Sequence, residues 1–245
     1  MNQLTSQQVW DLSNQYYART TQVNNFIAEV GEGSRIFGKR ADSQDPPWWH
    51  FDFCSAIGCA VLGHSHAPIE NALLNLLITR RWNLLPFNDW PHEQGVLLAK
   101  RLCEITPGQF PKKVFYANSG TEAVEAAIKI CQAQREKEGQ SNRIKFIAFQ
   151  GAFHGRTGLA LSLNCSKKNH TAAFFKDKGD LQSGDKDRAL PVRHIPFPEK
   201  YNHDAVRQFK AFLDTLVLQD VNAIVMELVQ GEGGIRPTDY ACWKE

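Results

Sequence analysis

Apolar residues recur every three or four positions in several segments of the chain, and this spacing predicts amphipathic helices. The first helix is predicted to follow Thr5, because Thr5 and Gln8 form a capping box ahead of a stripe of apolar and aromatic residues. Further segments with the same periodicity predict a helix starting at Pro68, one from Pro91 to about Glu104, one over residues 122–138 and one over residues 204–218.

Two of these helices have a distinct inner and outer side. In the segment over residues 122–138, an apolar stripe would pack inward, and Glu125 and Lys129 would form an ion pair on the opposite, exposed side. Gly139 is expected to end this helix. In the segment over residues 204–218, the side chains expected to face the core are Val206, Phe209, Leu213, Leu216 and Val217.

Short apolar runs between the helices predict strands. The runs typical of buried strands are Lys113–Ala117, Ile144–Phe149 and Val221–Leu228. Because they alternate with helices, we expect an α/β fold whose sheet is mostly parallel. Earlier in the chain, Trp48–Phe53 is expected to be a strand, after turns and short strands over residues 31–47. Residues 164–190 form a long polar stretch, which marks a candidate functional loop.

The composition narrows the class of protein. Of the 245 residues, 42% are hydrophobic and 22% are charged, which is typical of a folded globular protein. The net charge of +2 comes from interspersed residues, so we expect no nucleic-acid partner. No apolar stretch is long enough to span a bilayer, so we expect no membrane partner. The six cysteines are scattered and the polar N-terminus carries no secretory signal, so we expect a cytoplasmic protein.

The first candidate site lies where a predicted strand meets the helix over residues 122–138. The sequence there is Asn118-Ser-Gly-Thr-Glu-Ala123. A helix start offers unpaired backbone N–H groups and the positive end of the helix dipole, so it can bind an anion. Gly120 allows close approach, and the hydroxyls of Ser119 and Thr121 can donate two further hydrogen bonds. The alternative is an ordinary capped helix. The spacing of a P-loop and the elbow of a serine hydrolase are both absent.

Two more polar clusters follow predicted strands. Phe153-His154-Gly155-Arg156-Thr157 comes a few residues after the strand that ends at Phe149, and α/β folds place their sites at the carboxyl ends of strands. Glu227-Leu-Val-Gln-Gly-Glu-Gly-Gly234 follows the last predicted strand, and its glycines indicate close approach of the backbone to a polar group. Taken singly, each cluster is also explained by a surface loop or a turn.

In this order, the three clusters resemble the class III aminotransferases of the 4-aminobutyrate, ornithine and acetylornithine group. The N-terminal part agrees, because the segment from Asp52 to Gly63-His64-Ser65-His66 is similar to that family's glycine-rich stretch ending in Gly-His-x-His. The resemblance covers the chain from about Gly31 to Pro237. One departure is small: the family's proline directly after Gly-His-x-His comes one place later here, at Pro68.

The resemblance implies a fold-type-I transferase that depends on pyridoxal 5'-phosphate (PLP) and acts as a homodimer. Residues 1–55 would be the N-terminal segment of the small domain. Residues 56–245 would form an incomplete PLP-binding large domain with a mostly parallel sheet. The residues that the resemblance assigns to the cofactor are Ser119, Gly120 and Thr121 for its phosphate, Phe153 for stacking on its pyridine ring, and His154 and Glu227 around it.

The resemblance also assigns residues to the substrates. Arg156 would bind a substrate carboxylate through a two-point contact. Glu232 would pair with a second substrate-binding arginine, which in the family lies further along than this chain reaches. Ile57 would line the substrate pocket, where an aliphatic side chain favours substrates like 4-aminobutyrate or acetylornithine over ornithine. The implied reaction moves an amino group from an amino acid or ω-amino acid to a 2-oxo acid.

The larger departure from the family is an absence. The family's Schiff-base lysine, and the aspartate that pairs with the pyridine nitrogen, both lie beyond the position of Pro237 and have no counterpart in the chain. The lysine holds the cofactor and moves the proton, so we expect no catalytic residue in this chain. A rival interpretation is a non-catalytic remnant that binds PLP or a partner subunit. A third is a metal site at His64 and His66, with His50, although a lone His-x-His lacks further ligands at usable spacing, so we expect no metal.

Overall fold

The computed structural model describes residues 4–18, 24–81, 83–85, 89–171, 174, 189–200, 202–215 and 220–239. The chain divides into two compact units, Met1–Leu85 and Pro86–Glu245. Each unit has helices and a sheet of its own.

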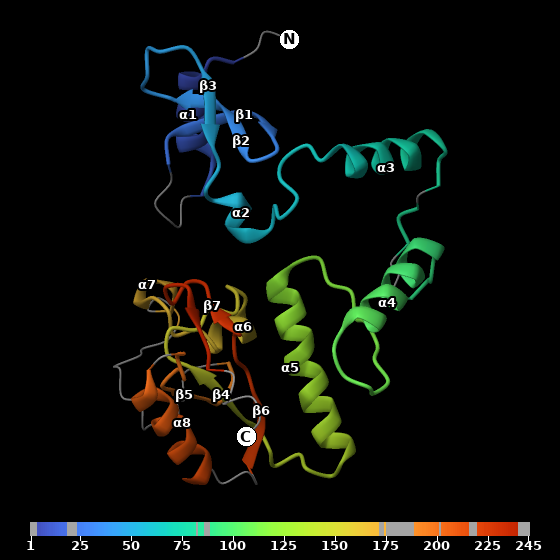
Figure 1. The fold of residues 1–245 in the computed structure, drawn as a ribbon, viewed down its shortest axis with the longest axis vertical. Coiled ribbons are helices and arrows are strands. Elements are labelled where there is room, and N and C mark those ends of the chain that lie inside the picture. Colours follow the sequence, from blue (N-terminus) through green and yellow to red (C-terminus); the bar gives the residue numbers. More distant parts are fainter. Residues whose placement is uncertain are drawn as a thin grey trace. The chain divides into compact units, whose positions relative to one another are not determined.

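The first unit is built on an antiparallel sheet whose central strand is β2. Its elements are α1 (Ser6–Tyr16), β1 (Phe26–Glu32), β2 (Arg35–Arg40), β3 (Trp48–Phe51), α2 (Ser55–Gly58) and α3 (Ala67–Ile78) (Figure 1). The predicted capping box is confirmed: Thr5 Oγ1 accepts from Gln8 N at 3.2 Å, and Gln8 Oε1 accepts from Thr5 N at 2.9 Å. The helix predicted from Pro68 and the strand predicted from Trp48 are confirmed as α3 and β3.

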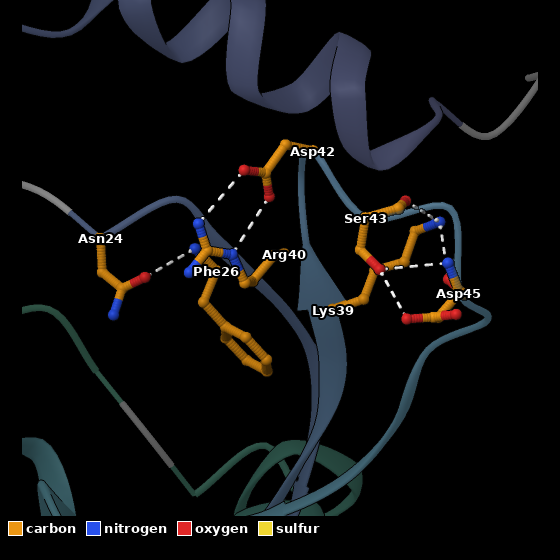
Figure 2. Close-up of polar contacts among 7 residues, drawn as sticks. All are labelled: Asn24, Phe26, Lys39, Arg40, Asp42, Ser43 and Asp45. Atoms are coloured by element: carbon orange, nitrogen blue, oxygen red, sulfur yellow. Dashed lines mark hydrogen bonds and ion pairs between the residues drawn. The ribbon is translucent and has the colours of Figure 1, made fainter.

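Polar contacts close the turn that follows β2 (Figure 2). The Arg40 guanidinium binds both carboxylate oxygens of Asp42, with Nε–Oδ1 and Nη2–Oδ2 distances of 3.1 Å. This contact lowers the pKa of Asp42. Lys39 Nζ donates to the backbone carbonyl oxygens of Ser43 and Asp45. Because Arg40 and Asp42 face solvent, their contact fixes the path of the turn more than it adds to stability.

The second unit is built on a parallel sheet. In it, β4 (Lys145–Phe149) pairs with β5 (Val192–Ile195) on one side and with β6 (Val221–Ile224) on the other. Its helices are α4 (Glu93–Ile105), α5 (Gly120–Lys137), α6 (Gly158–Ser162), α7 (Lys168–Thr171) and α8 (His203–Thr215) (Figure 1). A short antiparallel pair, β7 (Val229–Gln230) and β8 (Arg236–Pro237), follows β6. The predicted α/β fold with a mostly parallel sheet is confirmed.

The core of the second unit lies on both faces of β4, because successive side chains of a strand point to opposite faces. On one face, Phe146 belongs to a buried cluster with Ile128 of α5. On the other, Phe149 packs against Phe209 of α8, with ring centroids 5.9 Å apart. Helices therefore cover both faces of the sheet, α5 on one side and α8 on the other (Figure 1). Burying a side chain of this size is worth roughly 1.5–3 kcal/mol.

The strand predicted over Lys113–Ala117 is wrong. No described residue pairs with this segment, and the Phe115 side chain is 59% exposed. An apolar run forms a strand only where a neighbouring strand completes its hydrogen bonds. One place beside β4 is taken by β5, which the apolar pattern missed because Arg193 and His194 interrupt it. The strand predicted over Val221–Leu228 is confirmed only for its first part, β6.

The helices of the second unit agree with the predictions in most respects. Gly139 follows α5 with a φ of 70°, the left-handed conformation that ends many helices. The predicted position of Glu125 on the exposed side of α5 is wrong, because its carboxylate is partly buried and contacts the start of α6. Of the side chains predicted to face the core from α8, Val206, Phe209 and Leu213 do so, and Leu216 and Val217 lie outside the described residues.

Several helices carry exposed apolar side chains. None of the residues of α3, Ala67–Ile78, is buried, and Leu73 and Leu77 are among the exposed ones. In α4 the exposed apolar residues include Val96 and Leu97. The apolar spacing that predicts α3 is therefore not matched by burial within its own unit. Among the helices that the structure describes, none has the length and apolar character needed to cross a membrane.

Candidate functional site

The N-terminus of α5 has two capping hydrogen bonds, and the space beside its first residue is open. Ser119 Oγ accepts from Glu122 N at 3.3 Å, and the Glu122 carboxylate accepts from Asn118 N at 2.7 Å. The first N–H groups of a helix, here those of Gly120 and Thr121, have no partner within it and lie at the positive end of its dipole. A Cβ built on Gly120 would meet no heavy atom within 4 Å, so the space beside it is open. This helix end is suited to a bound anion such as phosphate.

The loop after β4 is held through its backbone. Phe153 N donates to Glu227 Oε2 at 3.2 Å, and His154 N donates to Asn164 Oδ1 at 2.6 Å. Asn164 is buried, and its Nδ2 donates to Gly155 O at 2.6 Å. Sequence reasoning did not find Asn164, because its partners here are backbone groups and it belongs to no motif.

Gly155 brings this loop against the first turn of α5. Its φ is 134°, and a Cβ there would lie 2.2 Å from Thr121 Oγ1, so only glycine fits without a shift. The hydroxyl oxygens of Thr121 and Thr157 are 2.7 Å apart, and Thr157 Oγ1 donates to Glu125 Oε1 at 2.5 Å. The start of α5 and the loop after β4 are therefore one connected site.

Glu125 joins α5 to the start of α6. Besides the Thr157 hydroxyl, its Oε1 accepts from the N–H groups of Leu159 at 3.0 Å and Ala160 at 3.4 Å. The hydrogen bond from Thr157 lowers the pKa of Glu125, so the carboxylate is ionised at neutral pH. Sequence periodicity could not identify this contact, because it depends on how α6 docks against α5.

His154 is a neutral, half-buried imidazole. Burial, together with the charge of the nearby His194, lowers its pKa from 6.5 to about 4. Its Nε2 is buried and has no hydrogen-bond partner among the described residues. His154 therefore carries no positive charge at neutral pH.

The glycine-rich segment after β6 packs around a buried glutamine. Gln230 is fully buried, and its Nε2 donates to Gln150 O at 2.9 Å. A Cβ on Gly233 would lie 2.5 Å from Gln230 Oε1, so the glycine is needed for this packing. In the same segment, burial raises the pKa of Glu227, although two backbone N–H groups donate to its carboxylate. The predicted close approach to a polar group is therefore an approach to Gln230.

Charged side chains gather around Glu232. Lys167 Nζ lies 2.5 Å from Glu232 Oε2, and this contact lowers the pKa of Glu232. Arg156 is exposed and acts on the same carboxylate through its charge. The ring of Phe153 packs edge-on against His170, with centroids 5.6 Å apart. The structure thus brings Arg156 and Glu232 into one charged cluster beside the loop after β4.

Ile57 belongs to the first unit. It is 85% exposed and lies in the turn Ser55–Gly58, in which every residue has a positive φ. Asp52 anchors the start of this turn: its Oδ1 accepts from the backbone N–H groups of Cys54 and Ser55, and its Oδ2 lies 2.8 Å from His64 Nε2. In the part of the chain that the structure describes, no group of three or more His, Cys, Asp or Glu residues could hold a metal ion.

Comparison with known proteins assigns the family. The model of the class III aminotransferases matches residues 22–244. The chain belongs to this family. An acetylornithine/succinyldiaminopimelate aminotransferase of Buchnera aphidicola is 32% identical over 90% of the class III chain and 46% of its own length. A probable 4-aminobutyrate aminotransferase of Bacillus subtilis is 30% identical over 86% of the chain and 45% of its own length. The chain spans about half the length of the curated relatives it matches.

Solved transaminases share the fold of this class III chain. The ω-transaminase of Pseudomonas jessenii in complex with PMP aligns over 96% of the chain and 52% of its own, with a TM-score of 0.76 and 20% identity. A transaminase of the marine bacterium Virgibacillus aligns over 96% and 51%, with a TM-score of 0.77 and 17% identity. Nearly the whole chain therefore has the fold of PLP-dependent, fold-type-I transaminases, and it corresponds to about half the length of each. Class III aminotransferases depend on PLP.

Proposed function

We propose that this chain supplies the cofactor-phosphate site of a transaminase. The reaction would move an amino group from an amino acid or ω-amino acid, such as 4-aminobutyrate, to a 2-oxo acid. The observation that carries the proposal is the junction of α5 with the loop after β4, made by Thr121, Gly155 and Thr157. This junction joins a helix end suited to an anion to the loop that carries Phe153 and Arg156. Relatives named for acetylornithine and 4-aminobutyrate support amino acid substrates.

PLP would bind with its phosphate at the start of α5. The N–H groups of Gly120 and Thr121 and the hydroxyl of Ser119 would hold the phosphate, and the open space beside Gly120 supports this proposal. Phe153 would stack on the ring. When bound, PLP supplies an electron sink for the carbon that carries the amino group.

Two half-buried side chains would tune the surroundings of the ring. His154 is neutral at neutral pH, because burial lowers its pKa to about 4, so it adds no charge that competes with Arg156 for a carboxylate. Glu227 accepts from Phe153 N and so holds the backbone that carries the stacking ring. Both residues would therefore position the cofactor rather than react with it.

The substrates would be bound by charged and aliphatic side chains. The planar guanidinium of Arg156 can hold a carboxylate at two points, which lysine cannot. Glu232 carries a negative charge that would pair with the family's second substrate-binding arginine, and its ion pair with Lys167 supports this role. The resemblance assigns Ile57 to the substrate pocket, and an aliphatic side chain at that position would favour substrates like 4-aminobutyrate or acetylornithine over ornithine.

The setting of this reaction is also proposed. Residues 1–55 would belong to the small domain and residues 56–245 to the PLP-binding large domain, and the active protein would be a homodimer in the cytoplasm. None of the described cysteines forms a disulfide, which fits a reducing compartment.

A comparison of PLP with pyridoxal, which lacks the phosphate, tests the proposed site. Absorbance titration of the 245-residue protein is expected to show tighter binding of PLP than of pyridoxal. Ser119→Ala should weaken PLP binding about tenfold or more, because a hydrogen bond to a charged group is lost, and should leave pyridoxal binding nearly unchanged. Equal binding of the two compounds would contradict the phosphate site.

Borohydride reduction tests the expected lack of a catalytic lysine. After reduction with PLP and peptide mass mapping, no single lysine should be labelled stoichiometrically, and no amino-group transfer should be measured. One fully labelled lysine together with turnover would contradict this expectation. Sequencing the DNA downstream of codon 245 distinguishes the transaminase from the rival interpretation, a non-catalytic remnant. An in-frame continuation that encodes the family's aspartate and lysine supports the transaminase.

A further inference from the structure

The carboxylate of Glu125 accepts three hydrogen bonds at one oxygen atom. Thr157 Oγ1 donates at 2.5 Å, and the N–H groups of Leu159 and Ala160 donate at 3.0 and 3.4 Å. Lys129, one turn along α5, is the charged group that also acts on this carboxylate. An ionised carboxylate can only accept hydrogen bonds, so the proton in each contact comes from the neighbour.

This arrangement fixes the direction of the hydrogen bond between the two threonines. A threonine hydroxyl has one proton, and that of Thr157 is directed to Glu125. Thr157 Oγ1 must therefore accept from Thr121 Oγ1, 2.7 Å away. The Thr121 proton then points to Thr157 and not toward an anion at the start of α5. The sequence-based expectation that both the Ser119 and the Thr121 hydroxyls donate to a phosphate does not fit this direction.

We propose that Glu125 and Thr157 are positioning residues of the phosphate site. They hold the Thr121 hydroxyl as a donor to Thr157, so that Thr121 offers an anion only its backbone N–H. The Ser119 hydroxyl can still donate, because Ser119 Oγ uses a lone pair, not its proton, in the contact with Glu122 N. This inference rests on the proposed cofactor function and gives a role to two residues that the motif assigned to no ligand.

A purely structural role for Glu125 would be that of a cap for α6. The N-cap residue of α6, Thr157, makes no capping contact of its own, and Glu125 accepts from two of the first N–H groups of that helix. Both roles lead to a loss of stability when Glu125 is replaced. Only the positioning role requires the Thr157 hydroxyl to link Glu125 to Thr121 by hydrogen bonds. The tests therefore change that hydroxyl.

The first test is an NMR titration of the Glu125 carboxyl carbon in the ¹³C-glutamate-labelled, 245-residue protein. The midpoint should lie below that of an ordinary glutamate, and Thr157→Val should raise it, because a donor to the ionised form is lost. Thr157→Ser keeps the hydroxyl and should leave the midpoint near that of the unchanged protein. Lys129→Met measures the separate effect of the lysine charge. An unchanged or lowered midpoint in Thr157→Val would overturn the proposal.

The second test measures the binding of inorganic phosphate and of PLP to Thr121→Val, Thr157→Val, the double variant and the unchanged protein. Thr121→Val should weaken binding several-fold more in the Thr157→Val background, because only there is the Thr121 proton free to turn to the anion. An equal or larger loss in the unchanged background would mean that Thr121 already donates to the anion, which overturns the proposal. If the unchanged protein binds neither ligand, the proposed cofactor function fails, and the titration of Glu125 still decides the positioning role.

Discussion

Gly155 is the residue at which two segments distant in sequence come into contact. It has the left-handed φ that glycine tolerates, and it lies so close to Thr121 that no side chain fits between them. The threonine pair next to it, Thr121 and Thr157, and the Glu125 carboxylate depend on this approach. The geometry of the candidate site is therefore set first by the absence of one Cβ atom.

Replacing Gly155 tests this close approach. Gly155→Ala is expected to lower the free energy of unfolding by about 1–3 kcal/mol, because alanine is strained at this φ and its Cβ would displace Thr121. Gly158→Ala is the matched control: a Cβ there meets no heavy atom within 4 Å, so it should be neutral or stabilise by less than about 1 kcal/mol. Urea unfolding measures both, and equal effects would contradict the close approach.

The lowered pKa of His154 links stability to pH. Its folded value is about 4 and its ordinary value 6.5. Between these values the unfolded chain binds a proton that the folded chain does not. The free energy of unfolding is therefore unaffected by this group above about pH 6.5, and it decreases as the pH falls toward 4. The loss reaches at most about 3 kcal/mol, at 1.36 kcal/mol per pKa unit.

Urea unfolding at a series of pH values checks this link. His154→Gln should flatten the rise of the unfolding free energy between pH 4 and 6.5, because the titrating group is gone. His203→Gln, which replaces an exposed histidine of α8, should leave the rise as it is. The same slope in His154→Gln as in the unchanged protein would show that another group is responsible.

The residues of the site differ in how far the sequence could indicate their contacts. The capping role of Ser119 was predictable, because a cap and a following glycine are local signals. The contacts of Glu125 and Asn164 were not, because helical periodicity defines a face but not what packs against it. The roles of the other site residues toward cofactor and substrate follow from the family motifs and stay predictions.

At the scale of elements, local patterns predicted the helices better than the strands. α5 has a cap, an apolar stripe and a terminating glycine within its own sequence, so its existence and limits could be predicted. A strand needs a partner from elsewhere in the chain, and an apolar run does not specify one. Lys113–Ala117 has the composition of a strand without a partner, whereas β5 has a partner and a polar interior.

A pair of phenylalanine substitutions tests this difference. Phe149→Ala is expected to lower the free energy of unfolding of the second unit by about 3–5 kcal/mol, because the ring is fully buried against Phe197 and Phe209. Phe115→Ala, in the segment wrongly predicted to be a strand, should change it by only about 0.5 kcal/mol, as for a surface position. Far-ultraviolet circular dichroism in urea follows both. Comparable losses would mean that Phe115 is packed in solution.

For the whole molecule, burial is divided unequally between the two units. Among the described residues of the first unit, Ala41 alone is a buried apolar side chain, whereas the second unit contains two buried clusters on the faces of β4. The hydrophobic contribution to stability, which grows with the apolar area buried, therefore lies mostly in the second unit. That unit also contains the junction of α5 with the loop after β4, so the proposed phosphate site lies in the unit with the larger buried core.

The exposed apolar side chains of α3 and α4 determine how the chain behaves as a colloid. A net charge of +2 provides little mutual repulsion, and residues such as Leu73 and Leu77 provide short-range attraction between molecules. Static light scattering should therefore give a negative osmotic second virial coefficient that falls further as ammonium sulfate is added, because this salt strengthens apolar association. Replacing Leu73 and Leu77 with Gln should raise the coefficient, and a positive value in the unchanged protein would mean that these side chains are covered in solution.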